Sequence, residues 1–113
     1  MTRRIFIAGN WKMNLGPAAS AKLAAEIAAG LKGMADVTVD VALAPMSVSL
    51  PAVAAALVNR GVHVAGQNLH PSPSGAFTGE LPGSALREVG CAYVIIGHSE
   101  RRQSFGETDA WIN

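Results

Sequence analysis

Short apolar runs alternate with longer amphipathic segments along this chain. Four runs rich in β-branched residues fall at Arg4–Ala8, Val37–Ala44, Val62–Gly66 and Tyr93–Gly97. Three of them are almost continuously apolar, which is typical of strands buried on both faces of a parallel sheet. The second run alternates more, because threonine and aspartate stand between its valines. The pattern predicts four strands.

The segments between these runs have helical patterns with recognisable ends. They predict three helices, which lie between Pro17 and Gly33, from about Ser49 to Arg60, and from about Gly83 to Val89. In the first, Leu23, Ile27 and Leu31 recur every four positions and form one apolar face. Strand, helix and strand repeated three times predicts parallel pairing with right-handed crossovers.

Two α/β architectures share this pattern, the open doubly wound sheet and part of a (β/α)8 barrel. The first strand is followed by Gly9-Asn10-Trp11-Lys12-Met13-Asn14, which matches neither common glycine-rich phosphate loop. A complete barrel has about 250 residues, so four strands in 113 residues correspond to half of one. We expect a single domain over residues 1–113, an N-terminal half-barrel truncated at Asn113.

Composition narrows the class of protein further. Half of the residues are hydrophobic and 15% are charged, so disorder is not expected. The net charge is +1 without a basic block, which argues against a nucleic-acid partner. No apolar run is long enough for a signal peptide or a membrane span. A single cysteine, Cys91, fits a reducing compartment, and we expect a cytoplasmic protein.

Polar residues gather directly after the predicted strands. They are Asn10 and Lys12 after the first, Gln67, Asn68 and His70 after the third, and His98–Arg102 after the fourth. Because ligands bind beyond the carboxyl ends of parallel strands, we expect these residues to converge on one face. The alternative is that they are ordinary polar loop residues.

Lys12 and Asn10 are candidates for contact with substrate. A lysine ammonium at a strand end can hold an anion or stabilise a developing oxyanion, although most lysines are simply solvated. The Asn10 amide could orient a carbonyl or enediolate oxygen, or it could be a turn residue, because Gly-Asn is common in turns.

His98 is the sharper signal, because it directly follows the fourth apolar run. Ser99 could cap a helical turn that begins just after it, and the positive end of that helix would disfavour imidazolium. A neutral imidazole can donate a hydrogen bond to a carbonyl, although a histidine in this position is more often structural. Glu100 could be a general base, but pairing with Lys12, Arg101 or Arg102 is the expected role.

No metal site is expected. His63, His70, Cys91 and His98 lack the close paired spacing of structural zinc ligands. Cys91 is interpreted as a small buried hydrophobe just before the fourth strand, and His63 as a residue within the third.

Taken together, four motifs resemble the triosephosphate isomerase family over the entire chain. They are Gly9–Asn14, Ala65–Asn68 followed by Gly75–Glu80, Ile96–Arg102, and Phe105–Asp109. The resemblance implies a TIM barrel, of which this chain is about half. It also implies glycolytic and gluconeogenic interconversion of dihydroxyacetone phosphate and glyceraldehyde 3-phosphate through an enediol, without a cofactor.

The resemblance also implies roles for particular residues. Asn10 and Lys12 would bind the triose phosphate, and Lys12 would counter phosphate and enediolate charge. His98 would be the electrophile, kept neutral by a helix N-terminus as is known for this family. Glu100 would organise Lys12. The segment Phe77, Thr78, Gly79 and Glu80 would lie in a subunit interface, with Thr78 reaching the partner's site.

The chain departs from the family pattern in two ways. Met46 stands where a second proline usually follows the second strand, and the catalytic glutamate, closing loop and phosphate cradle belong to the half not represented. One expectation is therefore half of an isomerase, needing the C-terminal half or forming a homo-oligomer. The alternatives are a non-catalytic half-barrel that self-assembles through open strand edges, and an open-sheet phosphate binder.

Overall fold

A four-stranded parallel sheet organises the computed structural model, which describes residues 3–34 and 38–113. The strands are β1 (Ile5–Asn10), β2 (Val39–Ala44), β3 (His63–Gly66) and β4 (Cys91–Val94), and they lie side by side in chain order. All three pairings are parallel. The sheet confirms the predicted α/β class, and its consecutive strand order is that of a half-barrel.

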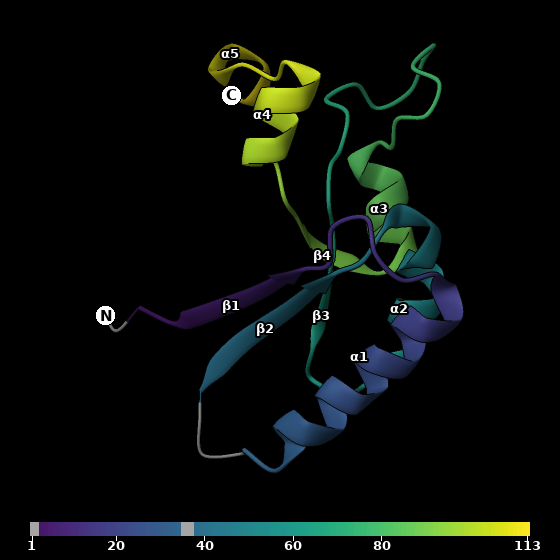
Figure 1. Ribbon diagram of the computed structural model, residues 1–113, viewed down its shortest axis with the longest axis vertical. Coiled ribbons are helices and arrows are strands. Elements are labelled where there is room, and N and C mark those ends of the chain that lie inside the picture. The colour runs from purple at the N-terminus through teal and green to yellow at the C-terminus, as the bar shows by residue number, and fades with distance from the viewer. Residues whose placement is uncertain (1–2, 35–37) are drawn as a thin grey trace.

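Helices connect the strands and extend the carboxyl end of the sheet. They are α1 (Pro17–Lys32), the 3-10 helix η1 (Ser47–Ser49), α2 (Leu50–Ala56), α3 (Gly83–Val89), α4 (Ser99–Phe105) and α5 (Asp109–Ile112). In Figure 1, α1, α2 and α3 lie on one side of the sheet, whereas α4 and α5 stand beyond the point where the chain leaves β4. No helix in the described ranges is long and apolar enough to cross a membrane.

The two faces of the sheet pack differently, because successive side chains in a strand point in opposite directions. Leu43 and Val64 face the helices and belong to the main core with residues of α1, α2 and α3. Small residues on the other face, Ala42, Ala44 and Ala65, form a second buried cluster. The apolar packing between helices and sheet therefore holds the crossovers in place.

The sheet is strongly curled. The rings of Phe6 in β1 and Tyr93 in β4 have centroids only 4.9 Å apart, although these strands are its opposite edges. Phe6 pairs with Asp40, two positions before Ala42, so it shares the face of the small-residue cluster. The two edge strands therefore bend toward each other on that face. A sheet that forms part of a barrel wall is expected to curve in this way.

Several strand boundaries differ from the predicted ones. β1 continues to Asn10, which pairs with Ala44, so Asn10 is the last strand residue rather than a loop residue. Val37, predicted to begin the second strand, lies outside the described residues. β4 starts at Cys91, which is therefore part of the strand, and it ends at Val94 because its neighbour β3 ends at Gly66.

Two further expectations are corrected. The helix predicted to reach Arg60 stops at Ala56, because the following residues leave the helical region and Asn59 has a positive φ of 59°. The first and fourth strands are not buried on both faces, and Tyr93 in β4 is 40% exposed. Ile5 and Ile7 are 59% and 56% exposed, since β1 is an edge strand.

The predictions for α1 and α3 are confirmed. Pro17 is at the start of α1, Gly33 follows its end, and Gly90 ends α3 in the left-handed region. The backbone at Met46 is one that a proline could adopt. Met46 precedes η1 with a φ of −56°, which is within the range that a proline ring imposes.

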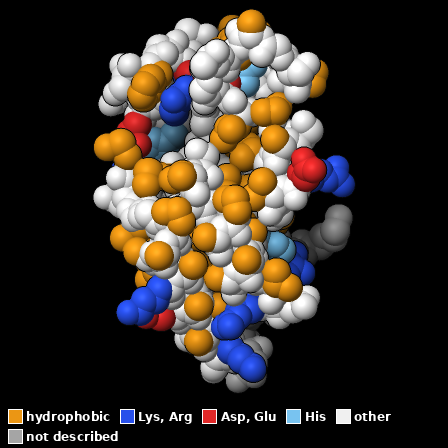
Figure 2. Space-filling model, turned by 90° about the vertical axis from the view of Figure 1, so that its right-hand side faces the viewer, with side chains coloured by type: hydrophobic (Ala, Val, Ile, Leu, Met, Phe, Trp, Pro, Cys, Tyr) orange, Lys and Arg blue, Asp and Glu red, His pale blue; other side chains and the backbone are white. Residues whose placement is uncertain are grey.

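The face of the molecule formed by these helices is not strongly charged. Figure 2 shows apolar side chains spread across it, with basic groups gathered mainly toward one end. Val48 and Val58, in the segments at the two ends of α2, are examples of exposed apolar residues. On this face the basic groups do not form a continuous stripe.

Candidate active site

The loop after β1 has a tightly defined backbone. Lys12 adopts a positive φ of 55°, which for a residue other than glycine costs about 1–3 kcal/mol. The side-chain oxygen of Asn10 accepts a hydrogen bond from the Lys12 backbone N–H at 2.9 Å. Asn10 therefore shapes the turn with its oxygen and retains its side-chain NH2 as a donor.

Gln67, directly after β3, holds this loop through hydrogen bonds to its backbone. Its Nε2 donates to the carbonyl oxygens of Lys12 at 2.8 Å and Ala44 at 2.9 Å. The Ala44 oxygen also accepts from the Trp11 backbone N–H at 3.0 Å. One amide thus joins the chain segments that follow or end β1, β2 and β3.

His98 caps α4, and Ser99, expected to be the cap, is instead the first residue of the helix. Gly97 turns the chain with a φ of 61°, and His98 Nδ1 then accepts a hydrogen bond from the Glu100 backbone N–H at 3.1 Å. A ring nitrogen that accepts carries no hydrogen, so in the neutral imidazole this bond leaves the proton on Nε2. That Nε2–H is a donor suited to a carbonyl oxygen.

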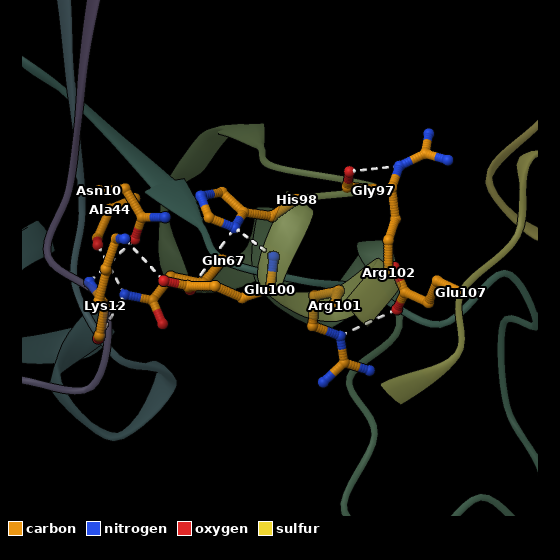
Figure 3. Close-up of polar contacts among 10 residues, drawn as sticks. All are labelled: Asn10, Lys12, Ala44, Gln67, Gly97, His98, Glu100, Arg101, Arg102 and Glu107. Carbon is orange, nitrogen blue, oxygen red and sulfur yellow. Dashed lines mark hydrogen bonds and ion pairs between the residues drawn. The ribbon is translucent and has the colours of Figure 1, made fainter. Parts of the chain in front are cut away.

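Lys12 and Glu100 form the contact that joins the two halves of the site. Lys12 Nζ donates to Glu100 Oε1 at 2.6 Å, and Glu100 Oε2 lies 3.5 Å from His98 Nδ1 (Figure 3). The hydrogen bond from Lys12 lowers the pKa of Glu100, with partial opposition from desolvation. Glu100 is therefore a pairing carboxylate, as expected, and a poor candidate for a general base near neutral pH.

The two arginines next to Glu100 have other partners. Arg101 Nε binds Glu107 Oε2 at 2.9 Å, and the Glu107 side chain is only 8% exposed. Arg102 donates to the Gly97 carbonyl oxygen at 2.9 Å and to Asp109 at 2.6 Å. These contacts hold α4 against the segment that follows it, and so they fix the position of His98.

The predicted interface residues form a separate group in the loop between β3 and α3. Phe77 stacks on the ring of the buried His70, with centroids 3.9 Å apart. The Glu80 backbone N–H donates to the Phe77 carbonyl oxygen, and this turn contains Thr78 and Gly79. Among the described residues, no hydrogen bond links this turn to Lys12, His98 or Glu100. The structure therefore does not bring these residues into the cluster around Lys12.

The histidine, cysteine and acidic side chains considered as metal ligands do not lie together in the described residues. The described part of the chain contains no group of three or more histidine, cysteine and acidic side chains placed to hold a metal ion. His63 packs edge-on against the Tyr93 ring. Burial raises the pKa of the Cys91 thiol, which keeps it protonated and unreactive near neutral pH.

Gln67 was the one residue of this cluster for which sequence reasoning assigned no role. Its place directly after a strand was the available signal, because the carboxyl ends of parallel strands share one edge. Its two acceptors, however, are backbone oxygens, and no side-chain motif marks a backbone oxygen. The interaction appears only once the strands are assembled.

This arrangement defines a class of protein. An ammonium, an imidazole and an amide converge at the carboxyl ends of parallel strands in a curled sheet, the usual place of the active site in (β/α)8 barrel enzymes. The sequence model of the triosephosphate isomerase family matches residues 5–113. The chain belongs to the triosephosphate isomerase family.

Individual relatives agree with this membership. The chain is 49% identical over 111 residues to a triosephosphate isomerase of Syntrophotalea carbinolica, which covers 98% of this chain and 43% of that protein. It is 50% identical over 117 residues to one of Rhodopirellula baltica, with 99% and 43% covered, and 49% identical over 114 residues to one of Acetivibrio thermocellus, with 100% and 44% covered. The chain thus spans less than half the length of these relatives.

Proposed function

We propose that this chain supplies the electrophilic and substrate-binding part of an isomerase that interconverts dihydroxyacetone phosphate and glyceraldehyde 3-phosphate. The observation that carries the proposal is the Lys12–Glu100 contact of 2.6 Å, which brings the loop after β1 to the start of α4, where His98 stands. Relatives at about half identity are named for this reaction.

Each residue has a chemical role in this proposal. His98 donates from Nε2–H to the substrate carbonyl oxygen, which polarises the adjacent C–H bond and stabilises the enediolate as a carbon-bound proton is removed. Lys12 supplies the positive charge that opposes phosphate and enediolate charge, and Glu100 holds its ammonium in place. Asn10 orients an oxygen through its side-chain NH2. Polarisation of this kind needs no cofactor.

The carbon-bound proton needs a base that these residues do not supply. The pKa of Glu100 is lowered by Lys12, so its carboxylate is too weakly basic for this step. We infer that the base comes from outside the described cluster. We also propose a cytoplasmic location, supported by Cys91 being a free thiol, which fits a reducing compartment.

The test is a chimera in which residues 1–113 are joined to the part of the Rhodopirellula baltica relative that this chain does not cover. We expect isomerase activity, and losses of about 10²–10³-fold in kcat for Lys12→Met and for His98→Ala. Lys22→Met, which removes an exposed lysine of α1, is the matched control and should retain the parent rate. Parent-like turnover by both site variants would contradict the assignment.

The proposal includes a homo-oligomer formed through Phe77, Thr78, Gly79 and Glu80. Phe77 supports it, because its ring is stacked on His70 yet 45% exposed. Sedimentation of the chimera is expected to show a dimer, and Thr78→Asp to yield monomers. A dimer that this charge does not affect would show that the interface lies elsewhere.

A further inference from the structure

The position of the Lys12 ammonium depends on an unfavourable backbone conformation. The φ of 55° directs the loop back over the sheet edge, and from there Nζ reaches Glu100. The conformation is not selected by the lysine side chain itself, because L-residues avoid this region. Something else must hold it.

Gln67 is placed to do so. Both of its acceptors are carbonyl oxygens, so its nitrogen end must face them, and the two hydrogens of Nε2 are directed to Lys12 and Ala44. Ala44 is fully buried in β2 and provides a fixed point. The amide therefore ties the Lys12 peptide to a buried strand residue.

This use of the amide leaves it no hydrogen to offer a ligand. Asn10 acts on the other side of the same residue, since its oxygen accepts from the Lys12 N–H. The peptide groups on both sides of the Lys12 α-carbon are thus held by side-chain amides, one from β1 and one from after β3. Figure 3 shows these groups together with Glu100 and His98.

We propose that Gln67 is a positioning residue, which holds Lys12 in its left-handed conformation so that the ammonium stays at Glu100 beside His98. A catalytic role for Lys12 rests on the proposed function. The hydrogen bonds that Gln67 and Glu100 make with Lys12 do not depend on it. Without the Gln67 donors, Lys12 should relax to a commoner φ and its ammonium should leave Glu100.

The test uses the titration of Glu100, followed by carboxyl ¹³C NMR in the 113-residue chain. In the unaltered chain the pKa of Glu100 lies below its ordinary value of 4.5 because of Lys12. Gln67→Met keeps the side-chain length and removes both donors, and we expect the pKa to rise toward 4.5. Lys12→Met defines the full rise, and Asn68→Ala, which alters the adjacent amide that binds Glu80, should leave the titration unchanged.

A loss of stability alone would not move this titration as long as the fold persists, which far-UV circular dichroism checks. A Gln67→Met variant with the unaltered Glu100 pKa would overturn the proposal, as would a Lys12→Met variant without a rise. If Gln67→Met does not fold, side-chain amide exchange in the unaltered chain decides. Gln67 should exchange much more slowly than the exposed Gln103 of α4, and equal rates would overturn the proposal. Neither readout requires isomerase activity. A failure of this proposal can therefore be distinguished from a failure of the proposed function in the chimera.

Discussion

Lys12 and Glu100 are 88 positions apart in the chain, yet their side chains meet at 2.6 Å at the carboxyl edge of the sheet. Both side chains are about half exposed, so water screens their attraction and the pair adds little to stability. Its importance is geometric. The contact forms only when β1 and β4 have been brought into the same curled sheet.

A polypeptide of residues 1–113 assayed alone is expected to show no isomerase activity above that of its His98→Ala variant. The carboxylate nearest His98 belongs to Glu100, whose lowered pKa makes it a weak base. Absence of general base catalysis typically costs about 10²–10⁴-fold. The measurement is a coupled assay of both proteins at equal concentration, and turnover that His98→Ala abolishes would show that a base is present.

Acid should weaken the link between the first two strands. Arg4 donates two hydrogen bonds of 2.8 Å to Asp40, and these hold the pKa of Asp40 below its ordinary 3.8, partly opposed by desolvation. A lowered folded-state pKa means that the stabilisation is present above 3.8 and disappears as the pH falls through the folded value. Asp40→Asn should therefore unfold at a lower temperature than the parent near neutral pH, with the difference vanishing in strong acid.

The control for this experiment is Asp109→Asn. Asp109 also pairs with an arginine, Arg102, but its side chain is 93% exposed, so little change in the unfolding midpoint is expected at any pH. An Asp40→Asn difference that persists unchanged into strong acid would mean that the variant acts through something other than this ionisation.

Gly97→Ala is expected to destabilise the protein by about 1–2 kcal/mol, the cost of a left-handed backbone for an L-residue. The φ of Gly97 is 61°, and an added Cβ would lie 2.6 Å from Ile112 Cδ1, so the Ile112 side chain must also move. Gly30→Ala is the matched control, because Gly30 lies in α1 with no neighbour near the added atom. That variant should be more stable by about 0.5–1 kcal/mol. Urea unfolding measures both, and equal effects would refute the role of φ.

The isolated 113-residue polypeptide is expected to self-associate through its open strand edges. Ile7 in the edge strand β1 is 56% exposed, and an exposed apolar edge favours pairing with another chain. Ile7→Lys should reduce the sedimentation coefficient at micromolar concentration, whereas Val48→Lys, at a somewhat more exposed site in η1, should not. A monomeric parent polypeptide, or equal effects of the two lysines, would contradict this prediction.

Local signals explain which parts of the fold could be predicted. Pro17 and Gly90 mark helix ends through their own backbone preferences, and both ends lie where they were predicted. The extent of β4 depends instead on a neighbour. Ile95 still donates to the Gly66 carbonyl oxygen, but β3 ends there, so the apolar run beyond it forms no further ladder. No pattern within the run itself contains that information.

The candidate site divides in the same way. The residue types and the order of their motifs indicate Asn10, Lys12 and His98 as candidates, and they predict a partner for Glu100, which the structure provides in Lys12. The prediction that Ser99 caps α4 is wrong. The cap is His98, because the φ of Gly97 and the rotamer of His98 bring its ring to the helix start. The role proposed for Gln67 could not be found, because it depends on three strands meeting at one edge.

The Gln67 amide binds main-chain oxygens alone. The contact that holds the loop backbone is therefore separate from the side chain that the loop presents. Because the bond to position 12 is made to its carbonyl group, that bond does not depend on the side chain that this position carries. A different functional group could therefore replace the ammonium, and the backbone would present it at the same point of the edge. Position 44 lacks that freedom, since its side chain is fully buried. Position 12 is therefore a site where the functional group can be exchanged by mutation while the hydrogen bond from Gln67 that holds its backbone is kept.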